Sequence, residues 1–192
     1  MNYQHAFHAG NFADVVKHTL LLKLIQALQQ KDKGFCVLDT HAGEGLYRLD
    51  EGAALRTQEA EEGIQRLLSM PTPPAVLHDF LQLVRQFCLH PNAQRLHIYP
   101  GSPLWAAMLL RPQDRLILNE LHPNAYASLR ETMRPYQEHQ KIAVHHMDAY
   151  QALKALLPPE PKRGLVLIDA PFEVVDEYER IIAGLKNAHQ RF

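Results

Sequence analysis

Four short apolar segments of this sequence each lead to an acidic residue, and this repetition constrains the fold more than any other feature. The segments span residues 35–38, 115–119, 142–146 and 164–168, and the acids that follow them are Asp39, Glu120, Asp148 and Asp169. Short runs of branched apolar residues are typical of buried parallel strands, and the run at 164–168 indicates a strand buried on both faces. Helical patterns separate the segments, so their order predicts an α/β fold with a parallel, doubly wound sheet.

The positions of the acids indicate where a ligand binds. In open α/β sheets, ligands lie outside the carboxyl ends of the strands, so all four acids are expected on one functional edge. A carboxylate such as Glu120, at the tip of a sheet strand, is the usual partner of ribose hydroxyls in nucleoside-binding sheets.

The helices are expected between and around these strands. They are predicted at residues 11–29, 103–110, 124–136, 152–157 and 176–188. Asn11 is expected to cap the first helix, and Ser102 the second, which begins with a proline. Lys17 and His18 lie near the start of the first helix, and on position alone they are expected to face solvent.

Residues 46–95 interrupt the alternation of strands and helices. Two amphipathic patterns, 57–68 and 75–89, flank the helix-breaking sequence Pro71-Thr72-Pro73-Pro74. The interpretation is a helical insertion within a single domain covering residues 1–192, which is an ordinary size for one domain. Its basic residues could meet a large substrate, or the insertion could serve packing alone. Residues 96–99 are expected to form a strand or an extended segment that enters a tight turn.

Composition excludes few functions. The formal net charge is −1, so a nucleic-acid partner would need a local basic face. No apolar run approaches the ~20 residues of a membrane span, and the first ten residues are too polar for a secretory signal. His5 and His8 have no acid or cysteine at ligand spacing, so no metal site is predicted. We expect a cytoplasmic protein that does not enter a membrane.

The loop after the first strand indicates the kind of ligand. Asp39 is followed by Thr-His-Ala and then by Gly43-Glu44-Gly45, where glycines permit a tight turn and a close approach of a ligand to the backbone. This spacing differs from the G-x-G-x-x-G of dinucleotide-binding loops, which serve pyrophosphate. An acid without a phosphate-binding loop suits a cationic ligand without phosphate, and S-adenosylmethionine fits that description. A purely structural turn is the alternative.

The tetrapeptide Asp169-Ala170-Pro171-Phe172 follows the last of the four strands. An aspartate with an aromatic residue three positions later places a hydrogen-bond acceptor beside a flat stacking surface. Such a pair suits a planar ring that bears an amino group. An ordinary Asp-Pro turn is the alternative.

Six segments, taken in order, resemble the large-subunit ribosomal RNA methyltransferase J family, which methylates the N6 amine of an adenine in 23S rRNA. They are YQHAFHAGNFADVVKHT, LDTHAGEG, YPGSP, NELHP, MDAY and GLVLIDAPF. The resemblance covers nearly the whole chain. It implies a Rossmann-like, S-adenosylmethionine-dependent methyltransferase domain that releases S-adenosylhomocysteine and acts on ribosomal RNA, with protein-free 23S rRNA as the expected partner.

The resemblance also implies roles for single residues. The cofactor-binding residues are Lys17, His18, His41, Ser102, Glu120, Asp148, Ala149 and Asp169. Glu120 would hold the ribose and Asp148 the adenine amine of the cofactor. Asp169 would be catalytic, with the Ala170 carbonyl as a second acceptor and Phe172 as the stacking ring. Tyr3 would approach the RNA. For Lys17 and His18 this reverses the expectation of solvent exposure.

The sequence departs from the family pattern in three places. Ala170 stands where the family has proline, and Ala149 stands where glycine is usual. Family members continue into three further C-terminal strands, which are expected to be missing here. Strand 164–168 would then be an exposed apolar edge, or another chain would cover it.

Two other functions stay open from the sequence. A DNA adenine or cytosine-N4 methyltransferase uses the same type of tetrapeptide for exocyclic amines. A catalytically impaired relative that only binds nucleosides or RNA is consistent with Ala170 and with the missing strands.

Overall fold

The computed structural model describes residues 5–89, 95–172 and 175–191, and its centre is a four-stranded sheet. The strands are β1 (Cys36–Asp39), β4 (Arg115–Asn119), β5 (Lys141–His145) and β6 (Gly164–Leu167), in the order β5-β4-β1-β6. Every neighbouring pair is parallel, and Val37 of β1 lies opposite both Leu116 and Leu165. The predicted parallel α/β sheet is therefore confirmed.

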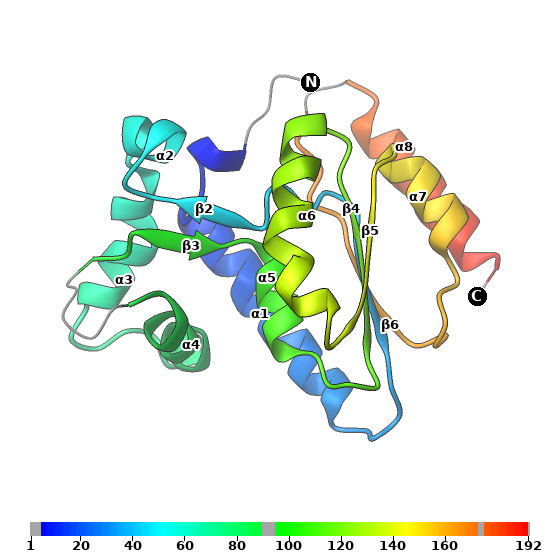
Figure 1. Ribbon diagram of the computed structural model, residues 1–192, viewed down its shortest axis with the longest axis horizontal. Helices are drawn as coiled ribbons and strands as arrows, with labels where there is room; N and C mark the ends of the chain where they lie inside the picture. Colours follow the sequence, from blue (N-terminus) through cyan, green and yellow to red (C-terminus); the bar gives the residue numbers. More distant parts are fainter. Residues whose placement is uncertain (1–4, 90–94, 173–174, 192) are drawn as a thin grey trace.

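Helices cover both faces of this sheet. On one face lie α1 (Phe12–Gln29), α5 (Ser102–Leu109) and α6 (Pro123–Gln137), and on the other lie α7 (Ala149–Leu156) and α8 (Glu177–His189) (Figure 1). Successive side chains of β1 alternate between two cores: Val37 packs on the α1 and α5 side, and Cys36 and Leu38 on the α7 side. Burial on both faces explains why β1 contains only apolar residues before Asp39, and the doubly wound arrangement is confirmed.

Strand β6 corrects one expectation. It pairs with β1 alone among the described residues, so it is an edge strand of the sheet. Gly164 is exposed, and Leu165, Val166 and Leu167 are only partly buried. The apolar run predicted full burial on both faces, but a strand with one neighbour leaves its outer side uncovered.

The insertion is not wholly helical. It contains β2 (Leu46–Arg48), α2 (Gly52–Thr57), the π-helical turn η2 (Glu61–Gln65), α3 (Arg66–Ser69), the 3₁₀ turn η3 (Ala75–Leu77) and α4 (His78–Cys88). Strand β2 pairs antiparallel with β3 (Ile98–Pro100), so residues 96–99 belong to a separate two-stranded sheet. Figure 1 shows this sheet and α2 to α4 beside the main body, on the side away from α7 and α8.

The predicted helix 57–68 is broken at two points. Thr57 ends α2, and Gln58 has left-handed backbone angles, so the helix cannot continue through it. Gly63 then has non-helical angles at a kink. There the backbone runs against the segment before α1, and the Ile64 N–H donates to the Gly10 carbonyl at 2.9 Å. A tertiary contact thus overrides the amphipathic pattern.

Two helix starts also differ from prediction. Asn11 caps α1 as expected, accepting the Asp14 N–H at 3.0 Å. Gly101, however, is the N-cap of α5, because the Ser102 hydroxyl donates to Asp39 instead. Helix α7 begins at Ala149, three residues earlier than predicted, because the Asp148 carboxylate accepts the N–H groups of Tyr150 and Gln151.

The arm before α1 contains the 3₁₀ turn η1 (His5–Phe7) and lies against the insertion. His8 Nδ1 lies 2.9 Å from Glu59 Oε1, and Asn11 donates to the same carboxylate at 3.0 Å. In the part of the chain that the structure describes, no helix is long and apolar enough to cross a membrane.

Candidate active site

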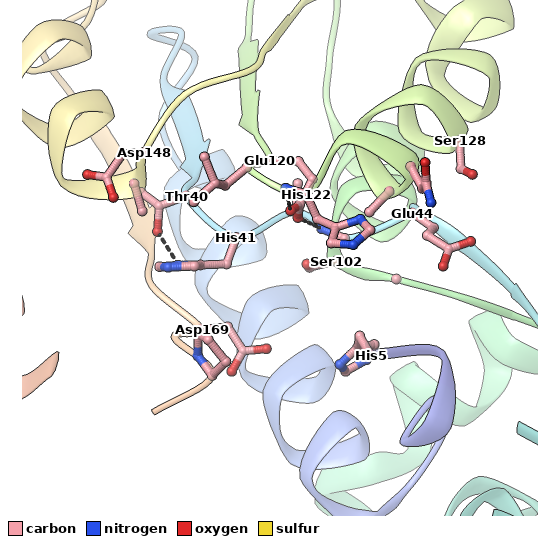
Figure 2. Close-up of a pocket in the computed structure, with 18 of the residues that line it drawn as sticks. His5, Thr40, His41, Glu44, Ser102, Glu120, His122, Ser128, Asp148 and Asp169 are labelled. Carbon is pink, nitrogen blue, oxygen red and sulfur yellow. Dashed lines mark hydrogen bonds between the residues drawn. The ribbon is translucent and has the colours of Figure 1, made fainter. Parts of the chain in front are cut away.

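A cavity of about 510 Å³ opens at the carboxyl edge of the main sheet. Glu120, Asp148 and Asp169 line it, following β4, β5 and β6 respectively, as the pattern of strand-tip acids predicts. Figure 2 shows these three side chains around the opening, with His5 of the arm on the same side as Asp169. The volume of the cavity lies within the range of ~300–1,000 Å³ that is usual for small-molecule sites.

Asp39, the fourth acid, supports the cavity from behind and does not line it. Its side chain is almost wholly buried, accepts the Ser102 hydroxyl at 2.6 Å and accepts the His41 N–H at 3.2 Å. Burial raises the pKa of Asp39 to about 6, although both hydrogen bonds oppose that change. Asp39 therefore positions Ser102 and His41, which do line the cavity.

Glu120 is held rigidly by the glycine loop. The Gly43 N–H donates to Oε2 and the His122 N–H donates to Oε1, both at 2.7 Å. Gly43 has a φ of +64°, and a Cβ at this position would collide with the Tyr47 hydroxyl. The loop after β1 therefore needs glycine at this point, and it presents Glu120 with both carboxylate oxygens already oriented.

Asp148 is fixed by α7 and α8. Its Oδ1 accepts the N–H groups at the start of α7, and its Oδ2 lies 3.2 Å from Arg180. The Arg180 guanidinium lies over the Tyr150 ring at 4.1 Å, and the Tyr150 hydroxyl donates to Glu177. Helix α8 therefore completes one wall of the cavity, next to the α7 N-terminus.

Asp169 forms an ion pair with a residue from the other end of the chain. Lys17 Nζ lies 2.7 Å from Asp169 Oδ2 and 2.8 Å from Asp14 Oδ1. Burial would lower the pKa of Lys17, but the two carboxylates outweigh burial and raise it, so the ammonium stays charged. The Lys17 side chain is only 16% exposed, so the expectation of solvent exposure from its helix position was wrong.

His18 is also buried, and it packs behind the cavity without lining it. Its Nδ1 lies 2.8 Å from the Tyr99 hydroxyl, and its ring packs among Phe80, Tyr99 and Trp105. Burial lowers the pKa of His18 to about 3, which makes the imidazole neutral. The position-based expectation failed here too, because the side of α1 that carries His18 packs onto α5.

The remaining residues implied by the resemblance divide into two groups. His41 and Ala149 line the cavity, and burial lowers the pKa of His41, whose Nδ1 lies 2.9 Å from Thr40 Oγ1. Ala170 is 6% exposed and Phe172 is 52% exposed, and neither lines the cavity, although Pro171 between them does. Phe172 has a φ of +53° and its ring lies 4.9 Å from that of Tyr178. Tyr3 lies outside the described residues.

Sequence reasoning missed several residues of the cavity wall. They are His5, Glu44, Tyr47, His122, Asn124, Ser128, Tyr150, Glu177 and Arg180. Glu44 lies in the segment LDTHAGEG and His122 in the segment NELHP, so these two motifs already indicated the loops that carry them. Glu177 and Arg180 gave none, because a surface helix after the last strand has no pattern that places it at a ligand. Within the described ranges, no group of three His, Cys, Asp or Glu side chains is arranged to hold a metal ion.

A parallel sheet in the order β5-β4-β1-β6, with a glycine loop after β1 and carboxylates at the strand tips, defines a Rossmann-like methyltransferase fold. The chain belongs to the family described as Ribosomal RNA large subunit methyltransferase D, RlmJ, whose sequence model matches residues 32–192. The family predicted from the six segments is therefore confirmed.

Relatives match along the whole chain. Proteins named Ribosomal RNA large subunit methyltransferase J from Escherichia coli K12 and Haemophilus influenzae are 44% and 41% identical over all 192 residues, which cover 66% of each relative. A crystal structure of a Legionella pneumophila protein superposes with a TM-score of 0.84 at 41% identity, covering 96% of this chain and 66% of that one. The chain thus spans 66% of the length of these relatives.

Proposed function

We propose that this chain catalyses S-adenosylmethionine-dependent methylation of the N6 amine of an adenine in 23S ribosomal RNA. The observation that carries the proposal is the position of Asp169, at the tip of β6 on a cavity that Glu120 and Asp148 also line. The names of the relatives, both ribosomal RNA large subunit methyltransferases, support ribosomal RNA as the substrate class. The adenine amine follows from the Asp169-Ala170-Pro171-Phe172 tetrapeptide.

The residues of the cavity fit S-adenosylmethionine, which supplies an electrophilic methyl group on a sulfonium when bound. Each oxygen of Glu120 accepts one backbone N–H and keeps a lone pair for a ribose hydroxyl. Asp148 Oδ2 faces Arg180 and is the acceptor for the cofactor's adenine amine. Three carboxylates favour a ligand with positive charge, and Lys17, His41, Ser102 and Ala149 complete the wall.

Asp169 and the Ala170 carbonyl then position the target amine. The lone pair of an adenine amine is delocalised into the ring, so the amine is a poor nucleophile. Two acceptors for its two N–H bonds favour a pyramidal nitrogen whose lone pair is directed at the methyl group. Lys17 engages Asp169 Oδ2, which leaves Oδ1 to accept an amine N–H. Bound S-adenosylmethionine would supply the methyl group, and the Asp169 carboxylate would accept the proton that the methylated amine loses.

Phe172 provides the stacking surface outside the cavity. Its ring is half exposed, which suits a base that has left a helix or lies in a single-stranded loop. Stacking on an aromatic ring contributes ~1–3 kcal/mol per base. Tyr3, which lies outside the described residues, is proposed to approach the RNA, and protein-free 23S rRNA in the cytoplasm is the proposed partner.

A catalytically impaired relative is the second candidate, because two observations favour it. Ala170 removes a backbone constraint from the catalytic loop, and Arg180 competes for the Asp148 oxygen assigned to the cofactor. In that case the cavity would bind the cofactor without transferring its methyl group.

The test is methyl transfer from labelled S-adenosylmethionine to protein-free 23S rRNA, compared with duplex DNA. Asp169→Asn keeps the size of the side chain and removes the charge, and Asp176→Asn, an exposed acid beside α8, is the matched control. We expect N6-methyladenine in the RNA with the wild type and the control, and none with Asp169→Asn. Cofactor binding by calorimetry without transfer would establish the impaired relative, and transfer to DNA alone would establish the DNA enzyme.

A further inference from the structure

Asp14 is a buried carboxylate that the mechanism above does not use. It lies in the first turn of α1 and is 1% exposed. A charge so deeply buried is costly unless it is paired and hydrogen-bonded, so its partners explain why the fold retains it.

The two oxygens of Asp14 serve two different parts of the chain. Oδ2 lies 3.0 Å from His5 Nε2 and accepts the Gly10 N–H at 2.9 Å, so it holds two points of the segment that precedes α1. Oδ1 forms the ion pair with Lys17 Nζ at 2.8 Å. Lys17 continues this chain of contacts to Asp169, and His5 lines the cavity on the same side (Figure 2).

These contacts keep the Asp14 carboxylate ionised. Burial alone would raise its pKa, but the hydrogen bond from His5 and the Lys17 ammonium outweigh burial and hold the pKa below its ordinary value. A lysine side chain is long and flexible, and Asp169 is 43% exposed. Without a buried anchor, their contact would compete with water and with other rotamers.

We propose that Asp14 is a positioning residue that holds the Lys17 ammonium against Asp169 and ties the His5 arm to the same point. With Lys17 shared between two carboxylates, only Oδ2 of Asp169 is engaged, and Oδ1 stays directed to the incoming amine. This inference rests on the proposed function, because it assigns Asp14 a part in presenting Asp169 to the substrate.

The test is Asp14→Asn, which keeps the size of the side chain and removes its charge. The matched control is Asp79→Asn, because Asp79 pairs with Lys23 on the same helix but both side chains are about half exposed. We expect kcat for methyl transfer to fall about 10- to 100-fold in Asp14→Asn, with KM for S-adenosylmethionine unchanged, since misplacing a catalytic group costs rate. The control should keep the wild-type kcat.

A second measurement separates positioning from loss of structure. In Lys17→Gln the pair with Asp169 is already gone, so adding Asp14→Asn should not lower kcat further. A double variant that loses another 10-fold or more would overturn the proposal. If Asp14→Asn alone does not fold, the double variant still removes both charges of the buried pair. The comparison of its kcat with that of Lys17→Gln then tests the proposal.

A third measurement does not depend on activity. The NMR signal of the Lys17 ammonium group, with its scalar coupling to the Asp169 carboxyl carbon across the hydrogen bond, reports the contact directly. The coupling should be present in the wild type and absent in Asp14→Asn, and its persistence in the variant would overturn the inference. If the wild type transfers no methyl group, the proposed function fails, while this coupling alone decides whether Asp14 positions Lys17.

Discussion

Lys17 Nζ lies 2.7 Å from Asp169 Oδ2, although the two residues are 152 positions apart in the sequence. The contact joins the second turn of α1 to the tip of the edge strand β6. It brings the first part of the chain into the wall of a cavity that the strand tips otherwise form. The proposed catalytic carboxylate is thus held by a helix outside the sheet, and the following predictions test how that arrangement works.

Lys17→Gln should destabilise the fold strongly, because it leaves the buried Asp14 without its cation. Removing one partner of a buried ion pair costs about 3–5 kcal/mol. Lys23→Gln breaks an exposed pair with Asp79 and should cost less than about 1 kcal/mol. The free energy of unfolding in urea measures both. Equal costs for the two variants would show that Asp14 and Lys17 are not a buried pair in solution.

The charge of Asp14 should make the wild type sensitive to acid. Its pKa in the fold is below the ordinary value of 3.8, so its contribution to stability is present above that pH and is lost as the pH falls further. Asp14→Asn should therefore lose less stability than the wild type when urea unfolding is compared at pH 7 and below pH 4. Parallel pH profiles for the two proteins would contradict this assignment.

Asp39→Asn should show the opposite pH dependence. The pKa of Asp39 is raised to about 6 in the fold from 3.8, so the stability contributed by its protonated form is present below the lower value and is lost as the pH rises through about 6. Asparagine imitates the protonated form at every pH. The variant should therefore gain up to ~3 kcal/mol relative to the wild type between pH 4 and pH 7. A difference in unfolding free energy that does not change with pH would rule out a buried, titrating Asp39.

Gly43→Ala should weaken cofactor binding, whereas Gly52→Ala should not. Both glycines have left-handed backbone angles, so alanine costs about 1–2 kcal/mol at either position. A Cβ at Gly52 meets open space, but at Gly43 it meets the Tyr47 hydroxyl and would displace the N–H that orients Glu120. Calorimetry should show that Gly43→Ala raises the Kd for S-adenosylmethionine about tenfold or more. Gly52→Ala should leave this Kd unchanged. Equal affinity in both variants would show that this loop does not shape the site.

The outer side of β6 should drive association between copies of this chain. Phe12, Val16, Leu20 and Leu24 form an exposed stripe on α1, which contacts β6, and Ile182 and Leu185 are exposed on α8. An edge strand beside apolar surface is a common site of pairing between chains. Sedimentation should detect dimers or larger species that the double variant Leu20→Glu, Ile182→Glu reduces. Val76→Glu, an exposed apolar position in the insertion, is the control, and a monomeric wild type would contradict the prediction.

Local patterns in the sequence were sufficient to predict the architecture. Apolar runs that end in Asp39, Glu120, Asp148 and Asp169 predicted four parallel strands with their functional ends together, and the structure confirms the sheet and its helical layers. Such patterns suffice because burial between two helical layers demands continuous apolar strands, and because parallel connections place every strand tip at one edge. The six segments likewise sufficed for the family, which the comparisons confirm.

Only the tertiary structure decided which of these residues reach the cavity. Asp39 ends a strand as the other acids do, yet it is buried behind Ser102, while Lys17 and His18 turned out to be buried on a helix whose position suggested solvent. Glu177 and Arg180 joined the wall from α8 without any sequence signal. The physical reason is that the periodicity of a helix or strand shows only which of its own faces is apolar. Burial and ion pairing also depend on residues more than a hundred positions apart, such as Lys17 and Asp169.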